Sequence, residues 1–387
     1  MPMLQMKGAF VKQSVRIFVV LCGWGLAALG QNRDVDQVPV SILYDRTVGL
    51  SNAWAEFSAA AFGKGGDLWV AVNSFQLGDS PKLMLPRLLR ISRDGKVEVE
   101  IEVRDPSPEK TPRTGKLSIV GIKQLTESTL DLIVSYSGHD IWWVRVDADG
   151  KELSSGKLIV VQQPFVVTGA IIEPDPHGVL LYGNQSQLPT AMYIERSGKA
   201  DWTVQLSDQR GMFTDATRMP DGKFALVASV TKEGSGDSLL VWANSKGVIQ
   251  QQPLNGRCFR ELISSQGILS GLVSRNNEVA IFTTNSAAQQ PQEKQTPIGR
   301  NLLKPVLAYA EKEQFTAIGI QGQKVVVATW NQQNDSKHWQ KELPGDPIID
   351  FDVFGSGGFI YVIAPTFSRS ANEVKETVRV IRLQVNP

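Results

Sequence analysis

A short turn recurs along this 387-residue chain at nearly equal intervals, and each copy stands directly before a hydrophobic run. Gly178, Gly222 and Gly267 are 44 and 45 residues apart. Gly358 follows Gly267 by 91 residues and Gly66 precedes Gly178 by 112 residues, so each gap has room for one further copy. A fixed period of this length, in a chain with almost no helical periodicity, indicates a series of similar β units.

Polar stretches at Thr126–Ser128 and Glu311–Gln314 occupy the two missing positions and give seven turns in all. A second set of turns, each a polar residue followed by glycine, divides the units further: Asp94-Gly95, Asp149-Gly150, Ser197-Gly198 and Lys246-Gly247. Such pairs between two apolar runs favour tight β-hairpins. Each unit therefore holds four short strands.

Four-stranded units with a period near 45 residues are typical of propeller blades, because one such sheet cannot bury both of its faces alone. We predict an all-β fold, a seven-bladed β-propeller of four-stranded antiparallel blades that forms a single domain over residues 31–387. The blades are expected at about 55–104, 116–162, 165–207, 211–255, 258–299, 302–344 and 347–387. A β-sandwich or stacked β domains are the alternatives.

The last predicted blade shows only three strands, so Val38–Tyr44 is expected to supply the fourth. Closure of the ring by both ends of the domain would remove the open sheet edge. The fifth blade is expected to be the weakest, because Ala287–Pro297 is rich in glutamine and predicts a loop or a poor outer strand.

Some stretches resemble known propeller repeats. Gly-Asp-Leu-Trp-Val-Ala at 66–71, with Leu-Leu-Arg-Ile-Ser-Arg-Asp-Gly-Lys-Val at 88–97, resembles one repeat of the NHL, regulator-propeller and streptogramin-lyase type. Residues 147–151 and 198–202 are similar to quinoprotein-like repeats. WD40 adaptors share repeated Gly-His and Trp-Asp pairs, and here Gly-His occurs once and Trp-Asp never. The resemblance implies the fold, which hosts many functions.

The first 30 residues have the composition of a secretory signal peptide. Three basic residues precede an apolar run at 17–29, and Ala28 and Gly30 fit a cleavage site. The run is shorter than the roughly 20 residues that span a membrane. We expect a signal peptide over residues 1–30 and a mature chain in the periplasm or outside the cell, without a membrane span. A buried strand or an uncleaved anchor is the alternative.

Charge and cysteine content exclude several classes of function. The whole chain has 40 Lys and Arg against 39 Asp and Glu, and loss of residues 1–30 would change the net charge from +1 to −2. Such a balance provides no field for nucleic acid. Only Cys258 would remain of the two cysteines, so neither an internal disulfide nor a cysteine-rich zinc site is expected. Cys258 is expected in the core.

Motifs of known chemistry are missing from the sequence. It contains no Gly-x-Ser-x-Gly elbow, phosphate-binding loop, His-Glu-x-x-His or sialidase box. A single mature cysteine is at odds with the paired cysteines of quinoprotein dehydrogenases. Asp147-x-Asp149-Gly150 begins like a calcium loop but has no glutamate at its end, so a plain hairpin is expected there.

Acidic residues on the innermost strands are the remaining catalytic candidates. Glu56 lies ten residues before its turn, Asp215 seven, and Glu261 and Asp352 six. Side chains on a strand alternate between faces, so these mixed positions do not predict one shared ion. Separate solvated carboxylates are expected. Glu56 and Asp215 are the weak candidates for a site in the central channel.

His139 and Asp140 form the other candidate pair, in the loop between the second and third strands of the second blade. Loops of this kind share a face with the channel mouth, so the pair could act as an acid–base couple. The simpler interpretation is a loop histidine capped by its neighbour, because only three histidines occur and no nucleophile pairs with this one.

Three long segments between second and third strands are expected to crowd one face as loops: 74–86, 231–238 and 366–375. Function usually gathers on such loops. Trp54, Phe75 and Phe367 could add aromatic surface there, although core positions are the commoner place for such residues. We therefore expect an exported binding or scaffold module that presents one loop-rich face to a protein or glycan partner. A metal-dependent hydrolase or lyase with its site in the channel is the alternative, and the sequence does not identify a cofactor or a bound metal.

Overall fold

The structure, a computed structural model, describes residues 40–49, 54–63, 66–75, 85–107, 116–136, 138–160, 163–173, 178–232, 235–254, 256–258, 261–276, 278–285, 287, 289–298, 302–311, 313–331, 338–343, 345, 351–356, 358–370 and 373–386. The chain divides into two units, Met1–Gln37 and Val38–Pro387, and everything below concerns the second. The predicted signal peptide lies outside the described residues.

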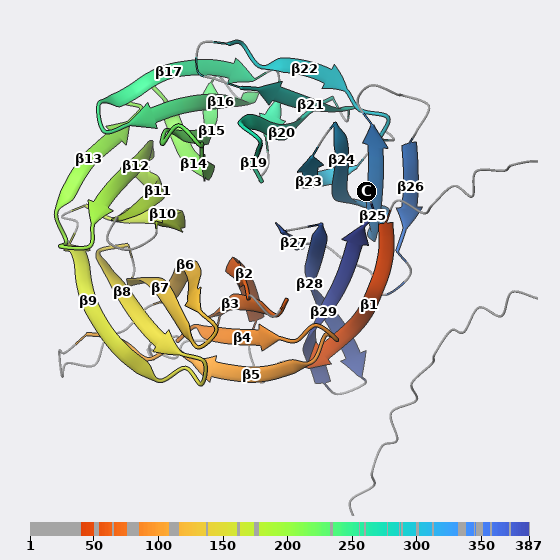
Figure 1. The fold of residues 1–387 in the computed structure, drawn as a ribbon, viewed down its shortest axis with the longest axis horizontal. Helices are drawn as coiled ribbons and strands as arrows, with labels where there is room; N and C mark the ends of the chain where they lie inside the picture. The colour runs from red at the N-terminus through yellow and green to blue at the C-terminus, as the bar shows by residue number, and fades with distance from the viewer. Residues whose placement is uncertain are drawn as a thin grey trace, which may run out of the picture. The chain divides into compact units, whose positions relative to one another are not determined.

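The second unit consists of antiparallel sheets arranged as blades around a centre (Figure 1). Blade 1 holds β2 (Trp54–Phe62), β3 (Leu68–Phe75), β4 (Arg87–Ile91) and β5 (Val97–Glu102). Blade 2 holds β6 (Leu117–Thr126), β7 (Thr129–Tyr136), β8 (Asp140–Asp147) and β9 (Glu152–Val160). Blade 3 holds β10 (Phe165–Ile172), β11 (Gly178–Gln185), β12 (Leu188–Glu195) and β13 (Ala200–Gln205). Blade 4 holds β14 (Arg210–Arg218), β15 (Phe224–Lys232), β16 (Ser235–Asn244) and β17 (Gly247–Leu254).

The remaining strands complete the ring. Blade 5 holds β18 (Arg257–Cys258), β19 (Ile263–Ser265), β20 (Ile268–Arg275), β21 (Glu278–Thr284) and β22 (Gln292–Gln295). Blade 6 holds β23 (Leu303–Glu311), β24 (Gln314–Gln321), β25 (Lys324–Asn331) and β26 (His338–Glu342). Blade 7 holds β27 (Asp352–Ser356), β28 (Phe359–Ser370), β29 (Glu373–Val385) and, on its outer edge, β1 (Val40–Gly49). The predicted seven-bladed propeller is therefore confirmed.

A hydrophobic cluster lies at each of the seven blade interfaces, because the central strands bury both of their faces. In β3, Leu68 and Val70 pack toward blade 7 while Trp69 and Ala71 pack toward blade 2. The other clusters join blades 2 and 3, 3 and 4, 4 and 5, 5 and 6, and 6 and 7. Strand alternation thus converts each short apolar run into contacts with two neighbours.

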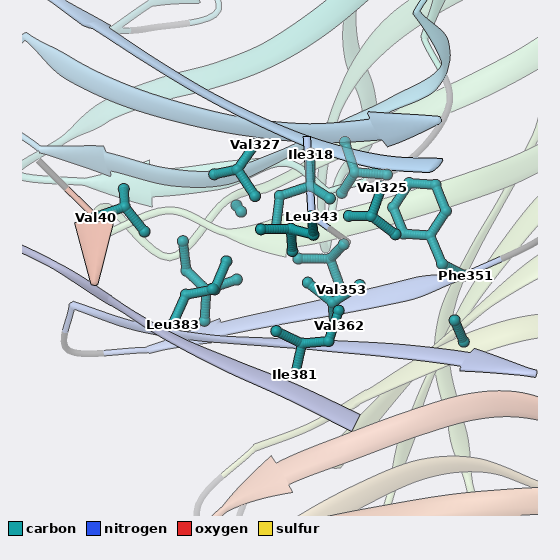
Figure 2. Close-up of a cluster of buried hydrophobic side chains, with 14 of the residues drawn as sticks. Val40, Ile318, Val325, Val327, Leu343, Phe351, Val353, Val362, Ile381 and Leu383 are labelled. Carbon is teal, nitrogen blue, oxygen red and sulfur yellow. The ribbon is translucent and has the colours of Figure 1, made fainter. Parts of the chain in front are cut away.

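Strand β1 closes the ring, as the sequence predicted, although it extends to Gly49. It pairs antiparallel with β29, from Val40 opposite Val385 to Gly49 opposite Thr377. Figure 2 shows Val40 in the cluster shared by blades 6 and 7, where its side chain is 3% exposed. The buried Arg379 on β29 forms an ion pair with Asp45 of β1.

One turn geometry recurs four times, at Ser92–Lys96, Asp147–Lys151, Glu195–Lys199 and Met219–Lys223. In each, the first residue's N–H donates to the carbonyl of the final lysine, and the glycine before that lysine donates to the first residue's carbonyl. The glycine has a positive φ in every copy, such as +77° at Gly150 and +83° at Gly222. Left-handed backbone is why this position is glycine. The expected hairpin at Asp147 is confirmed, and its carboxylate accepts the Asp149 and Lys151 amides.

Two of the three predicted loops are wrong for the part of the chain that the structure describes. Strands β15 and β16 continue to the pair Lys232 and Ser235, and β28 and β29 continue to Ser370 and Glu373. Alternating hydrogen bonds hold these segments as extended hairpins although their composition is polar. Residues 76–84 of the first loop lie outside the described residues.

Blade 5 departs from the others on both edges. Its innermost position is divided between β18 and β19, which both pair with β20. Its outer strand β22 has four residues. The prediction of a poor outer strand near 287–297 is confirmed.

Candidate functional site

A cavity of about 500 Å³ lies among the innermost strands. In Figure 1 the innermost strands of the blades surround the centre of the ring, β6, β10, β14 and β27 among them. The residues that line the cavity come from blades 1, 2, 3, 4, 5 and 7. A site at this position can therefore collect side chains from widely separated parts of the sequence.

Bulges determine which side chains of the innermost strands face the cavity. In five blades the innermost strand has a bulge with an extra residue at an equivalent position: Ser58, Val120, Thr168, Thr214 and Ala308. A bulge of this kind interrupts the alternation of side chains and redirects them. Val120, Thr168 and Thr214 all line the cavity. The bulges thus add side chains that strict alternation would place elsewhere.

Blades 2 and 3 provide a wall of hydroxyl and apolar groups. Lys116, Ser118 and Ser135 come from blade 2, and Phe165 and Tyr182 come from blade 3. Gly138, in the turn between β7 and β8, also lines the cavity and accepts the Phe165 amide proton at 2.9 Å. The cavity therefore reaches the face that carries the turns between second and third strands.

Blades 4, 5 and 7 provide three carboxylates, Asp215, Glu261 and Asp352, all half-buried. The Asp215 side chain accepts the Ala216 amide at 2.8 Å and the Leu262 amide of blade 5 at 2.5 Å. The prediction did not place these acids together. The bulge at Thr214 changes which side chains of β14 face the cavity, and Asp215 is among them. Glu261 reaches the same cavity from the segment between β18 and β19, where it adopts a left-handed φ of +69°.

A buried amide fixes the blade 1 side of the cavity. Asn73 is 2% exposed, and its side chain donates to the Ile119 carbonyl at 3.3 Å and accepts the Ile119 amide at 3.0 Å. This pair of bonds joins β3 to the innermost strand of blade 2. Burial of an amide is favourable only when it is hydrogen-bonded, so Asn73 sets the spacing of the two blades here.

The four predicted site residues come from blades 1, 2 and 4. Asp215 lines the cavity. Glu56 lies on β2 opposite Asn73, but its side chain is outside the described set. His139 is exposed in the β7–β8 turn, and its amide donates to the Tyr136 carbonyl. Asp140 begins β8 and pairs with Lys157 at 3.0 Å. Whether any of them has a role stays a prediction.

The described side chains contain no group of three or more His, Cys, Asp or Glu placed to hold a metal ion. Burial raises the pKa of the Cys258 thiol, and the nearby Asp215 charge acts in the same direction. The expected core position of Cys258 is confirmed, with 2% exposure. Within the described residues, no helix is long and apolar enough to cross a membrane.

Sequence reasoning missed Lys116, Asn73, Tyr182 and Met212 as cavity residues. These residues could have been recognised only by their position, near the start of the innermost strand of a blade or toward the end of the second strand. A prediction from position would have needed the exact location of each bulge. The bulges cannot be located from the sequence, because the residues that occupy them are of different types.

The ring, its seven interfaces and the central cavity define the class: the chain folds as a seven-bladed β-propeller. No protein-family model matches it, and no curated protein sequence matches it. A solved structure of catalytically inactive virginiamycin B lyase from Staphylococcus aureus with quinupristin is similar, with a TM-score of 0.54, 11% identity, and coverage of 89% of this chain and 99% of that chain.

The Dos1 propeller is also similar, with a TM-score of 0.53 and 11% identity over 86% of this chain and 78% of that chain. Likeness at this level of identity shows the fold alone. It agrees with the resemblance to lyase-type propeller repeats noted in the sequence.

Proposed function

We propose that the protein is an exported binding module that receives a protein or glycan partner where the central cavity opens. The proposal of export is supported by the composition of residues 1–30. The proposal of binding is supported by a concave site on a rigid ring, since ligands generally occupy clefts with mixed apolar and polar linings.

Exposed apolar side chains at the mouth of the cavity support the proposal of binding. Val166 on β10 is 55% exposed and Met212 on β14 is 36% exposed, and both line the cavity. Beside them stand the Thr168 hydroxyl and the Asp215 carboxylate. Exposed apolar side chains next to polar groups in a concavity are what a partner would cover.

A pair of matched variants tests this proposal. Val166→Trp would fill the cavity mouth, while Leu153→Trp would place the same ring on outer strand β9, where Leu153 is 51% exposed. A panel of short peptides and oligosaccharides is measured against each protein by ligand-observed NMR. We expect Val166→Trp to abolish the binding of hits that Leu153→Trp retains. Hits that bind all proteins equally would contradict the proposal.

Export is tested separately with residues 1–30 fused to a reporter that is active only outside the cytoplasm. We expect activity that disappears when Val19→Glu and Val20→Glu interrupt the apolar run. A reporter that stays inactive with the natural segment would contradict export without affecting the binding proposal.

A further inference from the structure

The charged side chains around the central cavity are unevenly distributed, and their distribution indicates which chemical class of ligand the cavity can bind. Its carboxylates, Asp215, Glu261 and Asp352, come from blades 4, 5 and 7. Lys116, from blade 2, is the single basic residue among the described lining. All four are half-buried, so their charges are less screened than those of surface residues. The described lining has more negative than positive charge, and the excess lies on one side.

The acidic side is held in a fixed arrangement. The Asp215 carboxylate bridges blades 4 and 5 through the Leu262 amide at 2.5 Å. Glu261 directly precedes Leu262, so the same bridge fixes the backbone from which its side chain extends. Charges that are already positioned lose little conformational freedom when a ligand binds, which favours affinity.

An apolar surface adjoins the carboxylates. Met212 and Asp215 lie on the same strand, β14, and Val166 lies on β10 of the neighbouring blade. The Thr168 hydroxyl is 4.0 Å from the Met212 sulfur, so the two strands meet at this point. Phe354 of β27 adds a half-buried aromatic ring on the side of Asp352. Exposed methionine and valine beside carboxylates complement a ligand with both an apolar body and a positive charge.

We infer that the central cavity binds an apolar amine, meaning an ammonium group attached to an aromatic or aliphatic body. The inference rests on the proposed binding function and specifies its ligand chemistry. The ammonium would lie against blades 4, 5 and 7, and the apolar body against Val166 and Met212. A free small amine and the amino end of a peptide that begins with an apolar residue share this chemistry.

Probes that differ only in charge test the inference on the full chain. They are 2-phenylethylammonium, neutral 2-phenylethanol and anionic phenylacetate, each measured by calorimetry and ligand-observed NMR. We expect the cation to bind about tenfold more tightly than the neutral probe, since partly exposed charge pairs each contribute a modest factor. The tripeptide amide Phe-Ala-Ala distinguishes the sources: tighter binding than 2-phenylethylammonium indicates a peptide end, and equal or weaker binding indicates a small amine.

Substitutions that remove charge but keep the shape of the side chain distinguish an effect of charge on binding from an effect on the fold. Glu261→Gln combined with Asp352→Asn should weaken 2-phenylethylammonium about tenfold and leave 2-phenylethanol unchanged. Asp215 is left intact because it joins two blades. Exposed Glu342→Gln combined with Asp201→Asn, on outer strands of blades 6 and 3, is the matched control and should change neither probe.

The outcomes distinguish this inference from the proposed function. If phenylacetate or 2-phenylethanol binds as tightly as the cation and Val166→Trp still blocks binding, the amine inference is wrong while the binding function stands. If no probe binds and the wider panel gives no hit that Val166→Trp blocks, both are wrong. A cation preference that survives the double substitution would also overturn the inference.

Discussion

Asp131 is fully buried on β7, and two guanidinium groups from different blades hold its carboxylate. Arg145 of β8 donates to both oxygens at 2.8 and 3.1 Å. Arg196, in the β12–β13 turn of blade 3, donates at 2.8 Å. Both guanidinium groups also contact the Trp143 ring, whose centroid is 4.8 Å from the guanidinium carbon of Arg145 and 5.0 Å from that of Arg196. A single residue therefore connects blades 2 and 3.

Asp131→Asn should lower the free energy of unfolding by about 3 kcal/mol, because removing one partner leaves partly buried charges uncompensated. Chemical denaturation measures the change. Asp201→Asn, on the exposed outer strand β13, is the control and should change it little. A loss for Asp131→Asn no larger than that of the control would contradict the connecting role.

Tyrosines make stability sensitive to alkali. Burial, together with a hydrogen bond to Glu173, raises the pKa of Tyr193 from 10.0 to about 12, and burial with Glu311 raises the pKa of Tyr309 to about 12. Burial also raises the pKa of Tyr44 and Tyr361. The unfolded chain loses these protons near pH 10, so stability present below pH 10 should fall as the pH rises toward 12.

Tyrosinate absorbance measures this effect, with denaturation curves at each pH. Tyr193→Phe should reduce the loss of stability between pH 10 and 12, because it removes one of the groups that ionise at different pH in the two states. Titration of all tyrosines near pH 10 in the folded protein would refute it.

At the scale of elements, turns were predictable and bulges were not. The four repeated turns all end in Gly-Lys. Each glycine has a positive φ, a backbone conformation that favours glycine, so the turn can be recognised from the sequence. A bulge demands no particular residue. Ser58, Val120 and Thr168 occupy equivalent bulges and differ in size and polarity. The fold and the blade bounds could therefore be predicted, whereas the shared cavity of Asp215, Glu261 and Asp352 could not.

The seventh blade depends on the inward face of β1. Val40→Asp should lower the free energy of unfolding by about 3 kcal/mol, because it places an unpaired charge in the cluster between blades 6 and 7. Leu43→Asp, at a position that is 43% exposed, is the matched control and should cost little. Thermal denaturation of both variants measures the difference, and equal effects would show that β1 contributes no buried face.

At the scale of the whole molecule, stability is distributed over seven similar interfaces, but among the described residues the edge strands of blade 5 are shorter than those of blade 4. The innermost strands of blade 5 have two and three residues, and its outer strand pairs through four. Fewer main-chain hydrogen bonds lower the free energy of local opening.

Hydrogen exchange should therefore be faster in peptides from residues 257–265 and 292–295 than in the corresponding strands of blade 4, residues 210–218 and 247–254. Exchange followed by mass spectrometry measures both sets in one sample. Equal protection of the two sets would contradict the prediction.

The pairing of β1 with β29 also determines when the seventh blade can form during synthesis of the chain. Val40 pairs with Val385, so this sheet cannot form until the ribosome has synthesised the strand at the far end of the domain. Six blades can assemble before β29 is synthesised, but the seventh cannot be completed until then. Until then the apolar faces that blades 6 and 1 turn toward blade 7 are exposed, and a nascent chain of this kind gains from being kept apart from its copies.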